Sequence, residues 1–146
     1  MKLHYFSPEE FHGWYDKMSP ELLVKLDVLR HQWGRPIRIS PAPGAVGRDD
    51  NSQSQHNYGA HGEVRAVDVF PAGVITEEDA ERFILSATDC GFRGIGVYAD
   101  WSPSIGFHLD VRPDKDIGYP ATWGAVNNEL GAQKYVTMAE ALEAIV

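Results

Sequence analysis

Cysteine is nearly absent from this chain, because Cys90 is the only one among 146 residues. An internal disulfide is therefore impossible. The chain does not need one, since a domain of this size buries about 68–70% of the surface that its unfolded chain exposes. We interpret Cys90 as a small hydrophobic residue near a helix end and not as a nucleophile.

Basic residues and long apolar runs are also scarce. Lys and Arg number 13 against 21 Asp and Glu, which gives a net charge of -8. This balance argues against a nucleic-acid partner, because phosphate binding needs a basic surface. No apolar run approaches the length of about 18 residues that a membrane-spanning helix needs, so membrane insertion is not expected.

Residues 1–15 lack the apolar segment of a signal peptide. We therefore expect the protein to be made in a cytoplasm, so that any action outside requires release at host lysis or carriage in a virion. The length is that of one ordinary domain, and neither a repeat nor a linker interrupts residues 1–146. A single monomeric domain is the expected organisation.

Local patterns predict an α+β fold. Helix starts are indicated where Ser7 and Ser19 precede Pro and Glu, and where Thr76 precedes three acidic residues. Strands are indicated by alternating apolar and polar residues. The expected helices begin near residue 8 and cover 20–33, 77–90 and 136–145; the expected strands cover 37–40, 64–70, 94–98 and 106–112; and 113–131 is expected to be irregular. This order predicts a small, mostly antiparallel sheet flanked by helices, with its strands joined largely as hairpins.

Imidazoles and carboxylates interrupt two of the predicted strands. His108 and Asp110 are two residues apart and therefore share one face of a strand, and Asp68 lies between two valines. The long polar loop 41–63 adds His56 and His61, and loops of this length inside a domain are often functional. Burial of such groups is costly unless they are paired or bind a metal. Two interpretations remain open: a metal-free His–Asp pair in the core, or a metal site with two imidazoles, a carboxylate and an open position for water.

Four short motifs together resemble the M15-type zinc D,D-peptidases, a family that includes D-alanyl-D-alanine carboxypeptidases and phage endolysins and shares its fold with the hedgehog signalling domain. The motifs are Ser54-Gln55-His56, Ala66-Val67-Asp68, Gly94-Ile95-Gly96-Val97-Tyr98 and His108-Leu109-Asp110. The resemblance implies a hedgehog-like fold and a zinc ion held by His56, Asp68 and His108. It also implies cleavage of peptide bonds in bacterial peptidoglycan stem peptides or cross-links.

The first ligand departs from the family spacing. The family places it seven positions before the Asp, where this chain has His61. His56 instead matches the Ser-x-His context and lies twelve positions before Asp68. We predict His56 as the ligand, with His61 as the alternative.

The position of the catalytic acid also differs from the family pattern. Many members of the family carry a Glu or Asp three residues before the last histidine, and Ile105 occupies that position here. Asp100 is the predicted catalytic residue, and Glu63 is a further candidate. Asp110 is better placed to orient a ligand histidine than to transfer a proton.

Substrate contacts are expected from basic and aromatic residues. The family uses an Arg after its first strand to bind a substrate carboxylate, and Arg48 is the candidate here, with Arg112 as a weaker alternative. Tyr58, Trp101 and Trp123 are candidates for the cleft walls. The sequence thus predicts a zinc metallopeptidase acting on peptidoglycan peptides. The alternative is a non-catalytic metal-binding domain of a phage particle that retains the peptidase fold.

Overall fold

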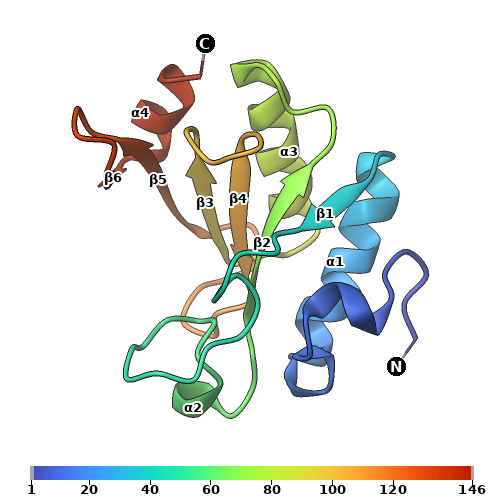
Figure 1. Ribbon diagram of the computed structural model, residues 1–146. Helices are drawn as coiled ribbons and strands as arrows, with labels where there is room; N and C mark the ends of the chain where they lie inside the picture. The colour runs from blue at the N-terminus through green and yellow to red at the C-terminus, as the bar shows by residue number, and fades with distance from the viewer. Residues whose placement is uncertain (1, 146) are drawn as a thin grey trace.

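A computed structural model describes residues 2–145 and contains a six-stranded mixed sheet in the order β1-β2-β4-β3-β5-β6 (Figure 1). The strands are β1 (Ile37–Ile39), β2 (Ala66–Pro71), β3 (Gly94–Tyr98), β4 (Gly106–Asp110), β5 (Ala121–Asn127) and β6 (Gln133–Val136). The helices are α1 (Pro20–Trp33), α2 (Tyr58–His61), α3 (Glu77–Asp89) and α4 (Met138–Glu143), and two short 3₁₀ helices, Pro8–Phe11 and Tyr15–Lys17, precede them. The α+β prediction is confirmed.

The C-terminal quarter departs from the prediction. Segment 113–131 was expected to be irregular, but it contains β5, and β6 precedes a last helix that is shorter than expected. Strand β5 pairs in parallel with β3, whereas the other neighbouring strands pair antiparallel. Its sequence ATWGAVN carries a central glycine and little alternation, so its extended conformation depends on a long-range partner that no local pattern signals.

A layer of helices covers one face of the sheet. Helix α3 contacts both α1 and α4, and the Phe83 ring of α3 packs against the Phe107 ring of β4 with centroids 4.6 Å apart. Leu22, Leu26 and Leu29 of α1 are fully buried, each contributing about 1.5–3 kcal/mol through removal of apolar surface from water. Among residues 2–145, none of the helices has the length and hydropathy to cross a membrane.

Three glycines on the opposite face of the sheet leave room for side chains from other positions. Asp110 lies over Gly94 of β3, Trp123 lies over Gly96 of β3, and Trp101 lies over Gly106 of β4. A Cβ atom at any of the three would overlap with the side chain above it. The Gly-x-Gly pattern of β3 therefore makes room for side chains that line this face.

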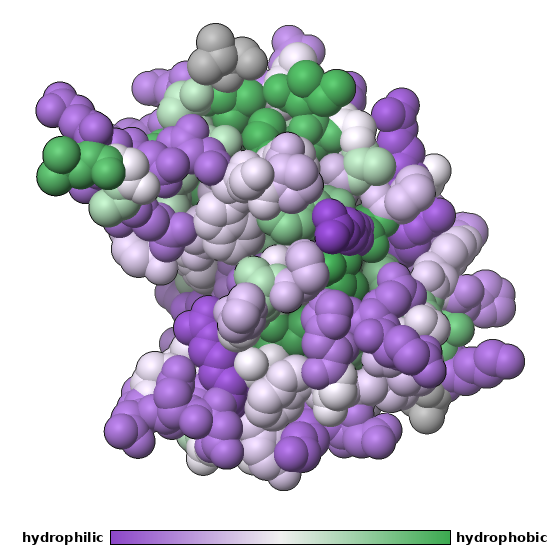
Figure 2. All heavy atoms as spheres, in the orientation of Figure 1, coloured by the Kyte–Doolittle hydropathy of each residue, from purple (hydrophilic) through white to green (hydrophobic). Residues whose placement is uncertain are grey.

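Two segments border the open face. Loop 41–63 lies along one side and the β5–β6 hairpin lies on the other (Figure 1). Figure 2 shows a hollow in the surface between the hairpin above and the loop below. The residues that line a cavity of about 600 Å³ come from both segments and from the sheet between them.

Candidate metal centre

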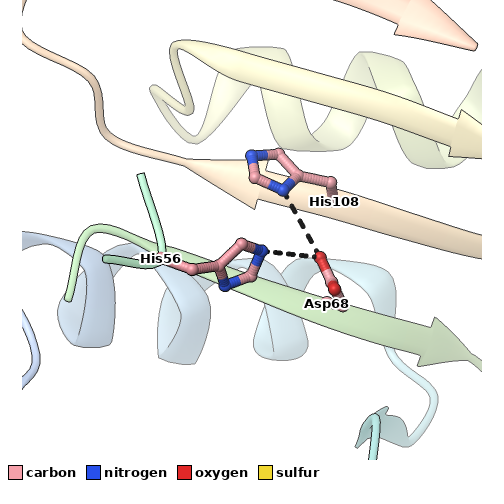
Figure 3. Close-up of side chains that lie close together, drawn as sticks. All are labelled: His56, Asp68 and His108. Carbon is pink, nitrogen blue, oxygen red and sulfur yellow. Dashed lines mark hydrogen bonds and ion pairs between the residues drawn. The ribbon is translucent and has the colours of Figure 1, made fainter. Parts of the chain in front are cut away.

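The structure brings His56, Asp68 and His108 together from three separate segments (Figure 3). Asp68 of β2 is the register partner of His108 on β4, and His56 arrives from loop 41–63. Asp68 Oδ1 lies 3.2 Å from His56 Nε2 and 3.4 Å from His108 Nδ1. The three residues are buried, at 2%, 7% and 7% exposure for His56, Asp68 and His108.

In each imidazole, the ring nitrogen that points away from Asp68 already has a hydrogen-bond partner. His56 Nδ1 lies 2.7 Å from the carbonyl oxygen of Val46, and His108 Nε2 lies 2.7 Å from Asp110 Oδ2. Both partners are acceptors only, so each of these nitrogens carries the hydrogen. In the neutral imidazoles the lone pairs of the other two nitrogens therefore face the Asp68 carboxylate. Three acceptors then converge on one point, an arrangement that is stable only with a cation or a proton between them.

The spacing of the three acceptors fits a metal ion. In a tetrahedral site with bonds of about 2.0–2.1 Å, two ligand atoms are separated by about 3.3–3.4 Å. The two separations from Asp68 Oδ1, 3.2 and 3.4 Å, match this geometry, and all three ligand atoms lie within 4.8 Å of one another. The cluster is thus a buried group that can hold a metal ion.

The electrostatics of the cluster favour a cation. Burial opposes ionisation of Asp68, but its contacts with His108 and His56 outweigh this effect and lower its pKa to about 2. Burial likewise opposes ionisation of Asp110, yet contacts with His108 and Arg112 hold its pKa well below the usual range. Burial disfavours a charged His108, but its two carboxylate neighbours raise its pKa above the ordinary value. Both carboxylates are therefore ionised at neutral pH, and the cluster attracts positive charge.

Asp110 orients His108. Its carboxylate is fully buried above Gly94 and receives hydrogen bonds from Arg112 Nε at 3.0 Å and Arg112 Nη2 at 2.7 Å. The backbone N–H of Arg112 donates a further bond of 3.0 Å. These contacts fix the carboxylate oxygen that accepts from His108 Nε2, which in turn aims His108 Nδ1 at the cluster.

Asp110→Asn is expected to weaken metal binding about 10–100-fold, the usual cost of losing such a partner of a ligand histidine. The amide keeps the size of the side chain but removes the charge that stabilises His108 and Arg112. A chelator competition assay measures the dissociation constant. Asp89→Asn, which changes an exposed carboxylate at the end of α3, serves as the matched control and should leave that constant unchanged.

Loop 41–63 is fastened in place by backbone and side-chain bonds. Asp68 N–H donates to the carbonyl of Ala45 at 2.9 Å, which ties the loop to β2. The buried Asn57 side chain donates to the carbonyl oxygens of Asp50 and Ser52 at 2.9 and 2.5 Å. Because Asn57 follows His56 directly, this anchoring holds the imidazole beside the Val46 carbonyl.

His61 lies outside the cluster. It ends the short helix α2, and its Nε2 lies 3.3 and 3.1 Å from the carbonyl oxygens of Gln53 and Ser54. The nitrogen therefore donates to the loop backbone, and the ring braces the segment that carries His56. Of the two loop histidines, the structure brings His56 to Asp68 and His108.

The candidate acids and bases lie elsewhere. Asp100 is exposed, and its Oδ2 accepts a 2.6 Å hydrogen bond from the backbone N–H of Asn127. Glu63 pairs with Arg65 at 3.1 Å, and neither acid lines the cavity. Ile105 is buried at 9% exposure. Within residues 2–145, Asp68 is the sole carboxylate that lines the cavity around the cluster.

Most of the residues predicted to contact substrate line the cavity. Arg48 and Arg112 both line the cavity, as do Trp101 and Trp123. Arg48 Nε donates to the carbonyl of Gly44 at 2.9 Å, which holds the side chain at the cavity edge. Tyr58 is not among the lining residues and instead lies beside Lys17, whose ammonium is 5.1 Å from the Tyr58 ring centroid.

Sequence reasoning missed several lining residues. Tyr98 ends the Gly-x-Gly-x-Tyr motif but received no predicted role, and Gln133 and Tyr135 lie on β6, which was not predicted. Gln55 also lines the cavity, and its Oε1 is buried without a hydrogen-bond partner among the described residues. A buried acceptor left unpaired is costly, so this oxygen is a position that a bound N–H group can satisfy. The Ser-Gln-His context was the available signal for Gln55.

Comparison of the chain with protein-family models, with curated proteins and with solved structures gives no significant match.

Proposed function

We propose that this protein is a zinc-dependent metallopeptidase that hydrolyses peptide bonds of bacterial peptidoglycan stem peptides or cross-links. The observation that carries the proposal is the convergence of His56 Nε2, Asp68 Oδ1 and His108 Nδ1 at the floor of an open cavity. Three protein ligands leave one tetrahedral position for water or substrate, as in catalytic rather than structural zinc sites.

Zinc is the metal that the donor set favours. Two imidazoles and one carboxylate are ligands common to catalytic zinc, and the site contributes no thiolate. When bound, zinc supplies a Lewis acid that polarises a carbonyl group and lowers the pKa of water towards about 7. The protein residues hold the ligands in one orientation through Val46 and Asp110, so little reorganisation accompanies the reaction.

Arg48 is proposed to bind a carboxylate of the substrate. Its Nε is occupied by Gly44, which leaves the two terminal nitrogens of the guanidinium for a bidentate pair. Arg48 also lines a second cavity of about 290 Å³, which shares Asp68 and Trp101 with the first. A substrate bound across the cluster is thereby held by a charged group beside the scissile bond.

The peptidoglycan assignment rests on the motifs and on the character of the cavity. The order of the Ser-x-His, Ala-x-Asp, Gly-x-Gly-x-Tyr and His-x-Asp motifs resembles the M15-type peptidases, and we propose the corresponding hedgehog-like fold for this chain. The unpaired Gln55 Oε1 can accept a hydrogen bond from a peptide N–H. The aromatic rings of Trp101 and Trp123 and the amide of Gln133 can contact an extended polar substrate.

Incubation of zinc-loaded protein with purified sacculi tests this function. Mass spectrometry of the soluble fragments should show new amino and carboxyl ends at one type of peptide bond. The same assay with His108→Ala and with chelator-treated protein provides the controls. Fragments that are cut in the glycan strands, or peptide cleavage that persists in His108→Ala, would refute the proposal.

Arg48→Gln is expected to lower kcat/KM about 10–100-fold, chiefly through a higher KM. A hydrogen bond to a charged group contributes about 1.5–3 kcal/mol, and glutamine cannot form the bidentate pair. Steady-state kinetics on a cleaved stem peptide measures the effect. Arg38→Gln, which changes an exposed arginine on β1, should behave as wild type. Equal kinetics for both variants would show that Arg48 does not bind substrate.

The second candidate function is a non-catalytic metal-binding domain, for example of a phage particle. The observation that favours it is the lack of a carboxylate other than Asp68 among the described residues that line the cavity, so a separate acid for proton transfer is missing. This function predicts stoichiometric zinc with no cleavage of sacculi. Zinc-dependent release of peptide fragments excludes it.

A further inference from the structure

The hydroxyl group of Tyr98 is held in one position beside the candidate metal centre. Tyr98 is the last residue of β3, is 6% exposed and lines the cavity with the three ligand residues. Its ring stacks on Trp101 with centroids 3.9 Å apart and an interplanar angle of 20°. The stack immobilises the ring, so the direction of its Cζ–Oη bond into the cavity is fixed.

Trp123 determines how that hydroxyl forms hydrogen bonds. The indole Nε1–H donates to the Tyr98 oxygen at 3.0 Å, and an indole nitrogen only donates. One acceptor position of the Tyr98 oxygen is thus filled, and its own proton is available to donate, with the Tyr135 hydroxyl as its other neighbour. The Trp123 ring also lies over Gly96, with its centroid 4.9 Å from that of His108. This ring bridges the hydroxyl and the metal ligands.

The hydroxyl stays protonated at neutral pH. Burial raises the pKa of Tyr98 above the ordinary value, and the hydrogen bond from Trp123 offsets only part of this effect. The neighbouring Tyr135 hydroxyl and the negative charge of Asp68 raise the pKa of Tyr98 further. Tyr98 is therefore a neutral, buried donor in a cavity that Asp68 alone supplies with a carboxylate among the described residues.

We propose that Tyr98 is a catalytic residue whose hydroxyl donates a hydrogen bond to the carbonyl oxygen of the scissile peptide as that oxygen gains negative charge. This inference rests on the proposed hydrolysis. In that reaction the water oxygen bonds to the carbonyl carbon, the C–N bond breaks, and the amine leaves with a proton from the water. Tyr98 keeps its own proton throughout, and Trp123 acts as its positioning residue.

Tyr98→Phe tests the assignment because it removes the hydroxyl and keeps the ring on Trp101. We expect kcat on a cleaved stem peptide to fall about 10²–10³-fold, the usual effect of losing one such donor, with KM within a factor of two. Zinc content should stay at one ion per chain. The phosphinate analogue of the cleaved bond, a tetrahedral mimic, should bind more weakly by a comparable factor. Tyr119→Phe, which changes an exposed tyrosine outside the cavity, is the matched control and should leave kcat unchanged.

Trp123→Phe provides a second test that does not touch the hydroxyl itself. It removes the indole donor while an aromatic ring remains over Gly96, and we expect kcat to fall with KM unchanged. In Tyr98→Phe the Trp123 indole N–H resonance should also shift, since the indole loses its acceptor. A wild-type kcat in either variant, with zinc retained, overturns the role of Tyr98 and leaves the proposed function standing. A wild-type protein that neither cleaves sacculi nor binds the phosphinate with zinc present overturns both.

Discussion

His56→Ala is expected to abolish zinc binding at stoichiometric concentrations, whereas His61→Ala is expected to retain it. His56 Nε2 faces Asp68 at 3.2 Å, while His61 Nε2 donates to the loop backbone at Gln53 and Ser54. Removal of a ligand should cost more than the about 10–100-fold in affinity that removal of a ligand's partner costs. Elemental analysis and isothermal titration with zinc measure stoichiometry and affinity.

The comparison of the two alanine variants contains its own control, because both histidines lie on the same loop within five positions of each other. A general loosening of loop 41–63 would weaken binding in both. Loss of zinc in His61→Ala together with retention in His56→Ala would reverse the ligand assignment. Retention in both would place the metal away from this loop.

Gly94→Ala is expected to weaken zinc binding at least tenfold and to destabilise the fold by about 1–3 kcal/mol. A Cβ at this position overlaps with the Asp110 carboxylate, which lies directly above it and is fully buried. The carboxylate must move away from His108 Nε2, and its bonds with Arg112 are disturbed at the same time. Chelator competition and thermal unfolding of the metal-free protein measure the two effects.

Gly124→Ala is the matched control for this substitution. It also adds a methyl group to a strand glycine, but on the face of the sheet covered by helices, where the new atom overlaps with Ala141 of α4. We expect a similar loss of stability with the zinc affinity of the folded protein unchanged. If both variants lose zinc affinity equally, the effect reflects general destabilisation and Asp110 has no special part in orienting His108.

The ligands on the strands were predictable because strand geometry is simple. Alternation places His108 and Asp110 on one face, and a carboxylate between valines marks Asp68 as a buried group in need of a partner. The pattern did not reveal that β2 and β4 are neighbours with these residues in register. That pairing is long-range and depends on the packing of the whole sheet.

Other parts of the site were beyond local patterns. The order of histidines in loop 41–63 did not decide between His56 and His61, because the choice depends on the Val46 carbonyl and on the bonds of Asn57. Trp123 was assigned to an irregular segment, since the part of β5 that carries it pairs with β3, a strand distant in the sequence. Asp100 precedes His108 by eight positions in the sequence, but its carboxylate accepts a hydrogen bond from the backbone N–H of Asn127.

A crystal structure of the zinc-loaded protein, with anomalous diffraction data collected at the zinc edge, tests the central claim most directly. We expect one strong anomalous peak at about 2.0–2.2 Å from His56 Nε2, Asp68 Oδ1 and His108 Nδ1, with a fourth position open to the cavity. A peak held by other residues, or none at this cluster at full zinc loading, would contradict it. The cluster would then be a metal-free pair of histidines around a buried carboxylate.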